Sequence, residues 1–143
     1  MPIERTFSLI KPDAVAKNKI GEILARYEKG GLRVIACKML QMTPEMVETL
    51  YHVHIGRPFF KDLVQFMSSG PVVACVLEGD DAVQRHRDIM GPTDPAAAAP
   101  GTIRADFGTK INRNAVHGSD AVDTAVYEIR CLFRPSEICS RPA

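Results

Sequence analysis

One histidine in this chain is a candidate nucleophile because of the residues around it. The tetrapeptide His117-Gly118-Ser119-Asp120 places an imidazole beside a glycine, and Ser119 and Asp120 favour the start of a helix. Backbone N–H groups at such a position are suited to meeting an anion. A neutral imidazole can attack an electrophile near neutral pH. The motif is short, however, and a buried structural histidine is the alternative.

Three cationic side chains could provide partners for such a histidine. Lys11 ends the first apolar run, Arg87 borders the apolar face of a predicted helix, and Arg104 lies in a long loop. Because surface charges are common, a solvated surface charge is the favoured interpretation of each of them taken alone.

The helix predicted after Pro58 carries two apolar stripes where one would bury a surface helix. The stripes are Phe59, Leu63 and Phe66, and Phe60, Val64 and Met67. The extra stripe could pack on a second subunit, clamp a flat ligand or pack in the core.

Other candidate sites have less support. The chain contains no Gly-rich loop of the P-loop or dinucleotide-binding type. His52 and His54 stand two residues apart and would point in different directions on a helix, which disfavours a shared metal ion. His86 falls within the apolar face of its predicted helix, so we expect a core or interface histidine rather than a catalytic one.

The four cysteines are scattered along the chain and form no Cys-x-x-Cys pair, which argues against a zinc site or a redox motif. They are Cys37, Cys75, Cys131 and Cys139. Two disulfides could form, but a chain of this length can fold without them, and a reducing cytoplasm is the expected compartment.

Composition predicts one globular domain spanning residues 1–143. Hydrophobic residues make up 45% and charged residues 24%, which is typical of soluble proteins rather than disordered ones. The net charge of +1 gives no reason to expect nucleic acid or membrane binding, so any anion must be recognised locally. Neither a signal peptide nor a membrane span is predicted.

The apolar pattern alternates between strands and helices. Strands are predicted at 6–10, 32–40, 71–77 and 115–118, and helices near 20–29, 43–51, 58–67, 81–90 and 122–134. Asp13 is a predicted helix cap, Thr43 caps a helix with Pro44 in its first turn, and Asp80 or Asp81 starts another. A long loop covers 91–114, where the prolines around Ala96–Ala99 disfavour a regular helix.

This order predicts an α+β sandwich of the ferredoxin-like βαββαβ type. It would contain an antiparallel four-stranded sheet with helices and a long loop before the last strand.

Collinear motifs over essentially the whole chain resemble the nucleoside diphosphate kinase family. They are Thr6-Phe7-Ser8-Leu9-Ile10-Lys11-Pro12-Asp13-Ala14-Val15, Arg57-Pro58-Phe59-Phe60, Ser69-Gly70-Pro71-Val72-Val73, Arg85-His86-Arg87, Gly91-Pro92-Thr93-Asp94-Pro95, Pro100-Gly101-Thr102-Ile103-Arg104-Ala105-Asp106-Phe107 and His117-Gly118-Ser119-Asp120. The resemblance implies ping-pong transfer of a γ-phosphoryl group from a nucleoside triphosphate such as ATP to a nucleoside diphosphate. This activity would maintain NTP and dNTP pools.

The resemblance also implies a role for each residue of the histidine motif. His117 would carry the phosphoryl group, Glu128 would hold its other ring nitrogen, and Ser119 would orient Glu128. Gly118 would leave room for the incoming phosphate.

Further residues are implied to bind the nucleotide. Arg87, Thr93 and Arg104 would hold the distal phosphates, with Lys11 and Tyr51 near the transferred group. Lys11 and Asn114 would reach the ribose 3′-hydroxyl. The base would stack on Phe59, with Leu63 and Ile111 on its other side, while Phe60 packs inward. Since stacking tolerates every base, broad nucleotide specificity is expected.

Mg²⁺ is the implied cofactor and would arrive on the nucleotide phosphates, with no protein ligands. The resemblance implies a homo-oligomer. The short tail after Phe133 resembles that of bacterial members, which are often tetramers, so a tetramer is favoured, with a dimer or hexamer as alternatives. Many members of the family carry a polar loop where this chain has the four alanines Ala96–Ala99, and this difference weakens the case for subunit contacts through the loop.

A non-catalytic ferredoxin-like module is the competing hypothesis, either a nucleotide sensor or an RNA-binding sheet. An RNA reader should carry exposed aromatic residues on its strands and a basic surface. Phe59 falls on a helix and the net charge is near zero. A sensor would be expected to lack His117 or Glu128, and this chain has both.

Overall fold

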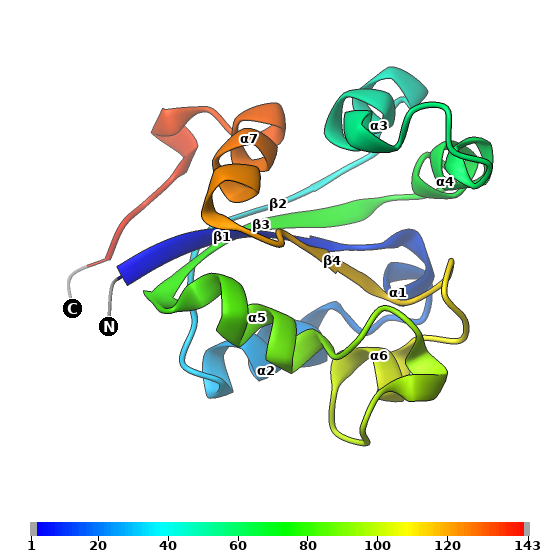
Figure 1. Ribbon diagram of the computed structural model, residues 1–143. Helices are drawn as coiled ribbons and strands as arrows, with labels where there is room; N and C mark the ends of the chain where they lie inside the picture. The colour runs from blue at the N-terminus through cyan, green and yellow to red at the C-terminus, as the bar shows by residue number, and fades with distance from the viewer. Residues whose placement is uncertain (1–2, 142–143) are drawn as a thin grey trace.

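A four-stranded antiparallel sheet in the order β2-β3-β1-β4 forms the centre of the computed structural model, which describes residues 3–141 (Figure 1). The strands are β1 (Ile3–Ile10), β2 (Arg33–Leu40), β3 (Val72–Asp80) and β4 (Val116–Gly118). The helices are α1 (Pro12–Ala16), α2 (Ile20–Lys29), α3 (Pro44–Leu50), α4 (Phe60–Met67), α5 (Ala82–Met90), α6 (Ile103–Phe107) and α7 (Val122–Leu132). The predicted ferredoxin-like α+β fold is confirmed.

Helices cover both faces of the sheet: α3, α4 and α7 lie on one face, and α2, α5 and α6 on the other (Figure 1). Each face has its own hydrophobic core. Successive residues of β3 alternate between the two, with Val72 and Ala74 in the first core and Val73 and Cys75 in the second. This double coverage explains the continuous apolar runs in the sequence, and it leaves neither face open for an RNA strand.

Because β1 pairs with β4, the motif that ends β1 at Lys11 lies beside the motif that contains His117. Leu9 pairs with His117 and Ser8 with Gly118. The Lys11 backbone N–H also donates to the Ala115 carbonyl at 2.8 Å. Strand pairing therefore places Lys11 and His117 at one edge of the sheet, although they are far apart in sequence.

Several predicted element boundaries differ from the observed ones. β1 begins at Ile3 rather than residue 6, because it pairs with β3 along its full length, with Ile3 opposite Asp80. α4 begins at Phe60, since a turn in which the Phe60 N–H donates to the Arg57 carbonyl precedes it. The predicted Thr43 cap is confirmed, and its side chain accepts from the Met46 N–H.

The predicted Asp13 cap is wrong. Lys11 occupies the N-cap position of α1, and no side chain caps that helix. Asp13 instead accepts a hydrogen bond from the Ala115 N–H at 3.0 Å through Oδ2. The carboxylate thus binds a backbone donor that immediately precedes β4 and is distant in sequence, rather than a donor in its own helix.

The long segment 91–114 is not wholly irregular. It contains a 3₁₀ turn at Pro95–Ala97 and the short helix α6, whose N-terminus is capped by the Thr102 side chain. α6 is what carries Arg104 toward the sheet. Among the described residues, the longest helix is α7 with 11 residues, and no helix is long and apolar enough to cross a membrane.

Candidate active site

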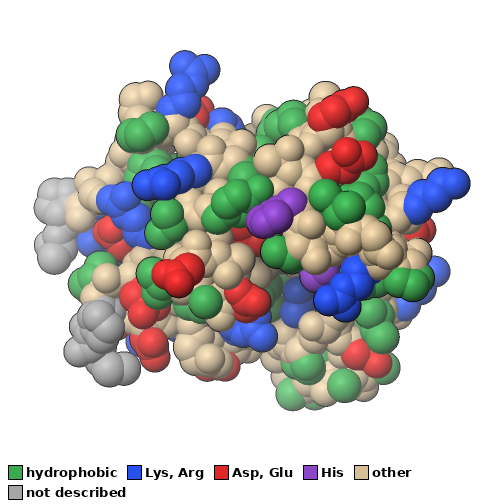
Figure 2. All heavy atoms as spheres, turned by 45° about the horizontal axis from the view of Figure 1, so that its top comes forward, with side chains coloured by type: hydrophobic (Ala, Val, Ile, Leu, Met, Phe, Trp, Pro, Cys, Tyr) green, Lys and Arg blue, Asp and Glu red, His purple; other side chains and the backbone are tan. Residues whose placement is uncertain are grey.

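A cavity of about 610 Å³ opens where β4, α7 and the end of α3 meet the long loop. In Figure 2, histidine and Lys or Arg side chains gather around a hollow in this face of the molecule. Every predicted site residue except Ser119 lines the cavity: Lys11, Tyr51, Phe59, Leu63, Arg87, Thr93, Arg104, Ile111, Asn114, His117, Gly118 and Glu128. The fold thus brings together segments from almost the whole chain.

A chain of hydrogen bonds holds the His117 ring. His117 Nε2 lies 3.0 Å from Glu128 Oε2, and the Ser119 hydroxyl donates to Glu128 Oε1 at 2.5 Å. Ser119 is fully buried behind Glu128, which explains why it does not line the cavity. Both hydrogen bonds implied by the resemblance are present. Because they fix the carboxylate at both oxygens, the imidazole has one preferred orientation.

Tyr51 lies beside the histidine at the C-terminal end of α3. Its ring meets the His117 ring edge-on, with centroids 5.1 Å apart. The hydroxyl is buried and has no partner among residues 3–141. Burial, assisted by the negative charge of Glu128, raises the pKa of Tyr51, so the hydroxyl stays protonated and can donate. A donor without a partner beside a candidate nucleophile is suited to an anionic group.

Lys11 and Asn114 form a second polar unit in the cavity. Lys11 Nζ donates to Asn114 Oδ1 at 2.8 Å, and Asn114 Nδ2 donates to the Thr93 carbonyl at 3.0 Å. The next residue, Ala115, has φ of +74°, a strained value for alanine, and its N–H is held by Asp13. The strained residue directly follows Asn114, the hydrogen-bond partner of Lys11.

Positive charge is concentrated on the same side of the cavity. Burial and the nearby Arg104 guanidinium lower the pKa of Lys11 to about 8. Arg104 is itself buried and donates to the Gly91 and Val116 carbonyls at 2.9 Å each. Its Nε has no partner in the described chain. Burial and Arg87 lower the pKa of Arg104. Mutual repulsion of these cations favours binding of a polyanion.

The outer part of the cavity is apolar. Phe59 is 47% exposed and Ile111 59% exposed, and both line the cavity with the partly buried Leu63. Phe60 packs against the core beneath α3, α4 and α7, as expected. Exposed apolar groups at a cavity mouth can accept the face of a planar ligand.

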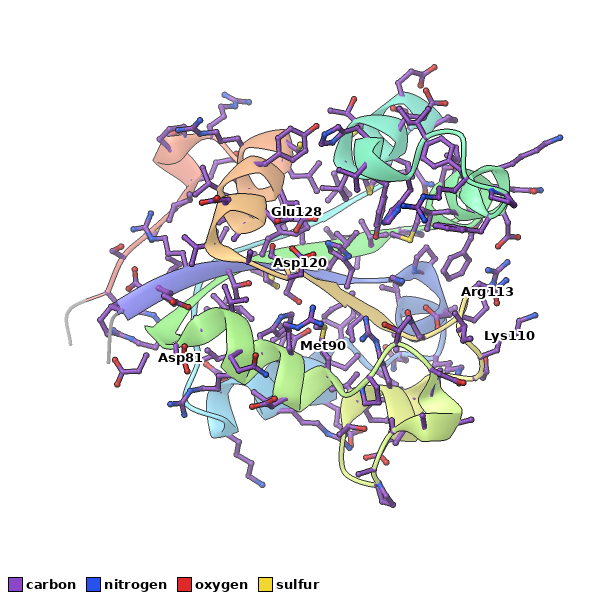
Figure 3. The ribbon with its side chains drawn as sticks, in the orientation of Figure 1. Asp81, Met90, Lys110, Arg113, Asp120 and Glu128 are labelled. Atoms are coloured by element: carbon purple, nitrogen blue, oxygen red, sulfur yellow. The ribbon has the colours of Figure 1, made fainter. Side chains whose placement is uncertain are left out.

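The structure gives a second reason for a glycine at position 118, besides the predicted one. Alternation along β4 turns His117 toward Tyr51 and α7, and Gly118 toward α5 on the other face. A Cβ at Gly118 would lie 2.5 Å from His86 Cε1 and 2.6 Å from Met90 Cε. Figure 3 shows Met90 on the α5 side of β4, across the strand from Glu128. The absent side chain makes room for α5, and room for a phosphate stays a prediction.

His86 is fully buried, as expected of a core histidine, but its setting is unusual. Neither ring nitrogen has a partner among the described residues, and the ring packs edge-on against Tyr27 with centroids 4.9 Å apart. Burial, assisted by the charges of His117 and Arg104, lowers the pKa of His86 to about 3. The ring is therefore neutral at any physiological pH.

Sequence reasoning missed five polar residues of the cavity: His54, Asp62, Asn112, Asp120 and Thr124. His54 contacts both Tyr51 and Phe59 through its ring, although His52 and His54 were considered only as a metal pair. Asp62 and Asp120 also line the cavity. Figure 3 places Asp120 close to Glu128 above β4. His54 lies on a 3₁₀ turn, where helical periodicity carries no signal.

Asp62 joins the two walls of the cavity mouth. Its Oδ2 accepts hydrogen bonds from Arg113 Nη1 and from Asn112 Nδ2, each at 3.2 Å. The Arg113 guanidinium also lies 3.9 Å from the centroid of the Phe66 ring. α4, which follows Phe59, is thereby tied to the loop that carries Ile111.

Comparisons with known proteins agree with this architecture. The family model for nucleoside diphosphate kinase matches residues 4–138. The chain is 60% identical over 141 residues to nucleoside diphosphate kinase of Bordetella pertussis, covering 99% of this chain and 100% of that one. A crystal structure of Aquifex aeolicus nucleoside diphosphate kinase superposes with a TM-score of 0.94 at 51% identity, covering 96% of this chain and 99% of that one.

A further solved structure, a halophilic nucleoside diphosphate kinase from Halobacterium salinarum in complex with CDP, gives a TM-score of 0.95 at 41% identity. The match covers 99% of this chain and 95% of that one. The fold, the relatives and the family model agree over nearly the full length. The chain therefore belongs to the nucleoside diphosphate kinase family of phosphotransferases.

Proposed function

We propose that this kinase works by ping-pong transfer through a phosphohistidine on His117. The observation that carries the proposal is the 3.0 Å hydrogen bond between His117 Nε2 and Glu128 Oε2. When Nε2 donates its proton there, Nδ1 keeps its lone pair, and no residue within 3–141 hydrogen-bonds to it. Nδ1 is therefore the ring nitrogen available for attack.

In the first half-reaction, Nδ1 attacks the γ-phosphorus of a nucleoside triphosphate such as ATP, and the bond to the β-phosphate oxygen breaks. Positive charge develops on the imidazole, and the Glu128 carboxylate stabilises it. The nucleoside diphosphate leaves, and a second nucleoside diphosphate takes the phosphoryl group by the reverse path. Ser119 supports the step by holding Glu128 in place.

The cations and donors around His117 would position the phosphates. Arg87 and Thr93 line the cavity, and Arg104 is held rigidly by its two carbonyl acceptors, so these residues would bind the distal phosphates. The Lys11 and Tyr51 donors would contact the transferred group, and Asn114 with Lys11 would meet the ribose 3′-hydroxyl.

The exposed ring of Phe59, with Leu63 and Ile111, would hold the base by stacking and apolar contact. The Halobacterium relative was solved with CDP, a pyrimidine nucleotide. A stacking site of this kind would also accept purine nucleotides, which supports broad specificity.

Mg²⁺ fits this donor set as an ion carried by the nucleotide. Within residues 3–141, no three His, Cys, Asp or Glu side chains are grouped to hold a metal, and Glu128 is committed to His117 and Ser119. The cavity offers cations for phosphate instead. When bound, Mg²⁺ would neutralise charge on the phosphate oxygens.

We further propose a cytoplasmic homo-oligomer, with a tetramer favoured, that maintains NTP and dNTP pools. Free cysteines at all four positions are typical of a reducing compartment. Large apolar side chains away from the cavity, including Ile3, Met39 and Val122, are exposed and are suited to subunit contacts.

Initial rates measured while ATP and a second nucleoside diphosphate are both varied would test the mechanism. The proposal predicts parallel double-reciprocal lines and no transfer by His117→Gln. His52→Gln is a matched control, because His52 is exposed and packs on Tyr127 outside the cavity, and it should retain full activity. Intersecting lines, together with transfer by the His117 variant, would instead indicate direct transfer in a ternary complex.

A further inference from the structure

The short helix α6, which carries Arg104 to the cavity, depends on contacts with the rest of the fold. It has five residues, whereas isolated helices shorter than roughly 12–15 residues are marginal in water. Ile103 and Phe107 anchor it in the hydrophobic core on the α2 side of the sheet. One arginine outside the cavity adds polar contacts at both ends of this helix.

That arginine is Arg26, on α2. Its Nη1 donates to the carbonyl of Gly101, which precedes α6, at 3.1 Å, and lies 2.8 Å from Oδ2 of Asp106, near the end of α6. Asp106 Oδ1 accepts from the Gly101 N–H at 3.3 Å. The Gly101 N–H, assisted by Arg26, lowers the pKa of Asp106, so the carboxylate stays ionised. The three residues thus form a closed ring of contacts across α6.

Further contacts fix the Arg26 guanidinium, whose side chain is only 23% exposed. Its Cζ lies 4.6 Å from the centroid of the ring of Phe107, the last residue of α6. Its Nη2 lies 3.3 Å from Oε1 of Glu22, one turn earlier in α2. Lys17, just before α2, donates through Nζ to the Phe107 carbonyl at 2.9 Å. Cations of the α2 region therefore hold the end of α6.

Arg104 lies between two sets of attachments. Its guanidinium is held by the Gly91 and Val116 carbonyls, and its backbone, as part of α6, is held by Arg26. Without Arg26, the backbone of Arg104 would keep the core anchors of α6 but lose the ring of polar contacts around it. A donor that is fixed before the ligand arrives binds at a lower entropic cost than a mobile one.

We propose that Arg26 is a positioning residue for nucleotide binding, which holds Arg104 at the distal phosphates through α6. This inference rests on the role proposed above for Arg104. Arg26 does not line the cavity and would touch no nucleotide. Every contact on which the proposal depends lies within one chain, so it holds whether or not a second subunit covers α2.

Calorimetric titration of the full-length protein with ADP and with AMP tests this role, because AMP lacks the distal phosphate. Arg26→Ala should raise the Kd of ADP by about five-fold, the lower end of typical couplings between sites, and leave the Kd of AMP unchanged. Arg85→Ala is the matched control, since Arg85 also donates to a backbone carbonyl but ties α5 to Gly30 at the end of α2. It should bind both nucleotides like wild type.

A double-mutant cycle with Arg104→Ala separates positioning from a general loss of structure. Arg104→Ala alone should weaken ADP binding and spare AMP, and equal binding of ADP by this variant and wild type would overturn the role of Arg104 itself. In the Arg104→Ala background, Arg26→Ala should cause no further loss of ADP binding. An effect that acts through folding or subunit assembly would persist in that background and would overturn the proposal.

Asp106→Asn removes the same ion pair from the α6 side and provides a second test if Arg26→Ala does not fold. It should weaken ADP binding to a smaller degree and again spare AMP. The positioning role is overturned if Arg104→Ala behaves as expected while Arg26→Ala and Asp106→Asn bind ADP like wild type. It is also overturned if these two variants lose ADP and AMP binding alike.

Discussion

Replacing Gly118 with alanine separates two explanations for a glycine beside the candidate nucleophile. If the glycine makes room for phosphate, the added methyl group should impair catalysis and leave stability unchanged. If it makes room for α5, the methyl group should destabilise the fold. The Cβ would stand 2.5 Å from His86 Cε1 and 2.6 Å from Met90 Cε, well inside van der Waals contact. His86 is fully buried and Met90 almost so, although Met90 also borders the cavity.

Overpacking of this kind in a well-packed core costs about 1–3 kcal/mol. For a chain of this size that corresponds to a fall in Tm of roughly 2–12 °C, at about 2–4 °C per kcal/mol. Thermal and urea unfolding of wild type and Gly118→Ala, at equal protein concentration, would measure it. Equal concentration matters because subunit association also contributes to stability.

A double-mutant cycle identifies the clashing partner. Truncating the neighbour with His86→Ala should cost stability in wild type but relieve the clash in the Gly118→Ala background. The two changes should therefore couple by about 1 kcal/mol or more, since contacting residues are not additive. The account of Gly118 is refuted if Gly118→Ala unfolds like wild type while its KM or kcat changes.

Three further predictions rest on other parts of the structure. The pKa of His86 is about 3 in the folded protein and about 6.5 in the unfolded chain, so between these values the unfolded chain binds one more proton than the folded protein. The free energy of unfolding should therefore fall as the pH is lowered, by about 2 kcal/mol from pH 6.5 to 5. Urea titrations at several pH values should show this dependence, and His86→Leu should flatten it. Phe59→Ala should weaken binding of all nucleoside diphosphates alike, by about 1–3 kcal/mol in competition assays, and a loss confined to one base would argue against stacking. Asp62→Asn removes an exposed ion pair with Arg113 that is worth on the order of 0.5 kcal/mol, so KM should rise about two-fold while kcat stays constant. A fall in kcat alone would count against a positioning role for Asp62.

The sequence was sufficient to predict the element order and most of the cavity lining. Apolar periodicity distinguishes buried strands such as β3 from amphipathic helices such as α7, and the ferredoxin-like topology follows from their order. The nucleotide-site residues came from motif resemblance, and the fold brings them into one cavity. Their catalytic roles stay predictions until the variants are measured.

What the sequence could not predict depends on contacts between distant segments. The reason for Gly118 lies in a helix on the far face of the sheet, and nothing local in His117-Gly118-Ser119 points to His86. Asp13 resembles a helix cap locally, yet it binds the Ala115 N–H across the sheet edge. Cys37 and Cys75 stand 38 residues apart and meet only through strand register.

The central claim is that His117 carries the phosphoryl group. Its most direct test is incubation of the protein with Mg²⁺ and γ-labelled ATP without an acceptor, followed by removal of free nucleotide. The account predicts an acid-labile label on His117 that any nucleoside diphosphate discharges, and no label on His117→Gln. An unlabelled wild-type protein, or a label that persists in His117→Gln, would contradict it.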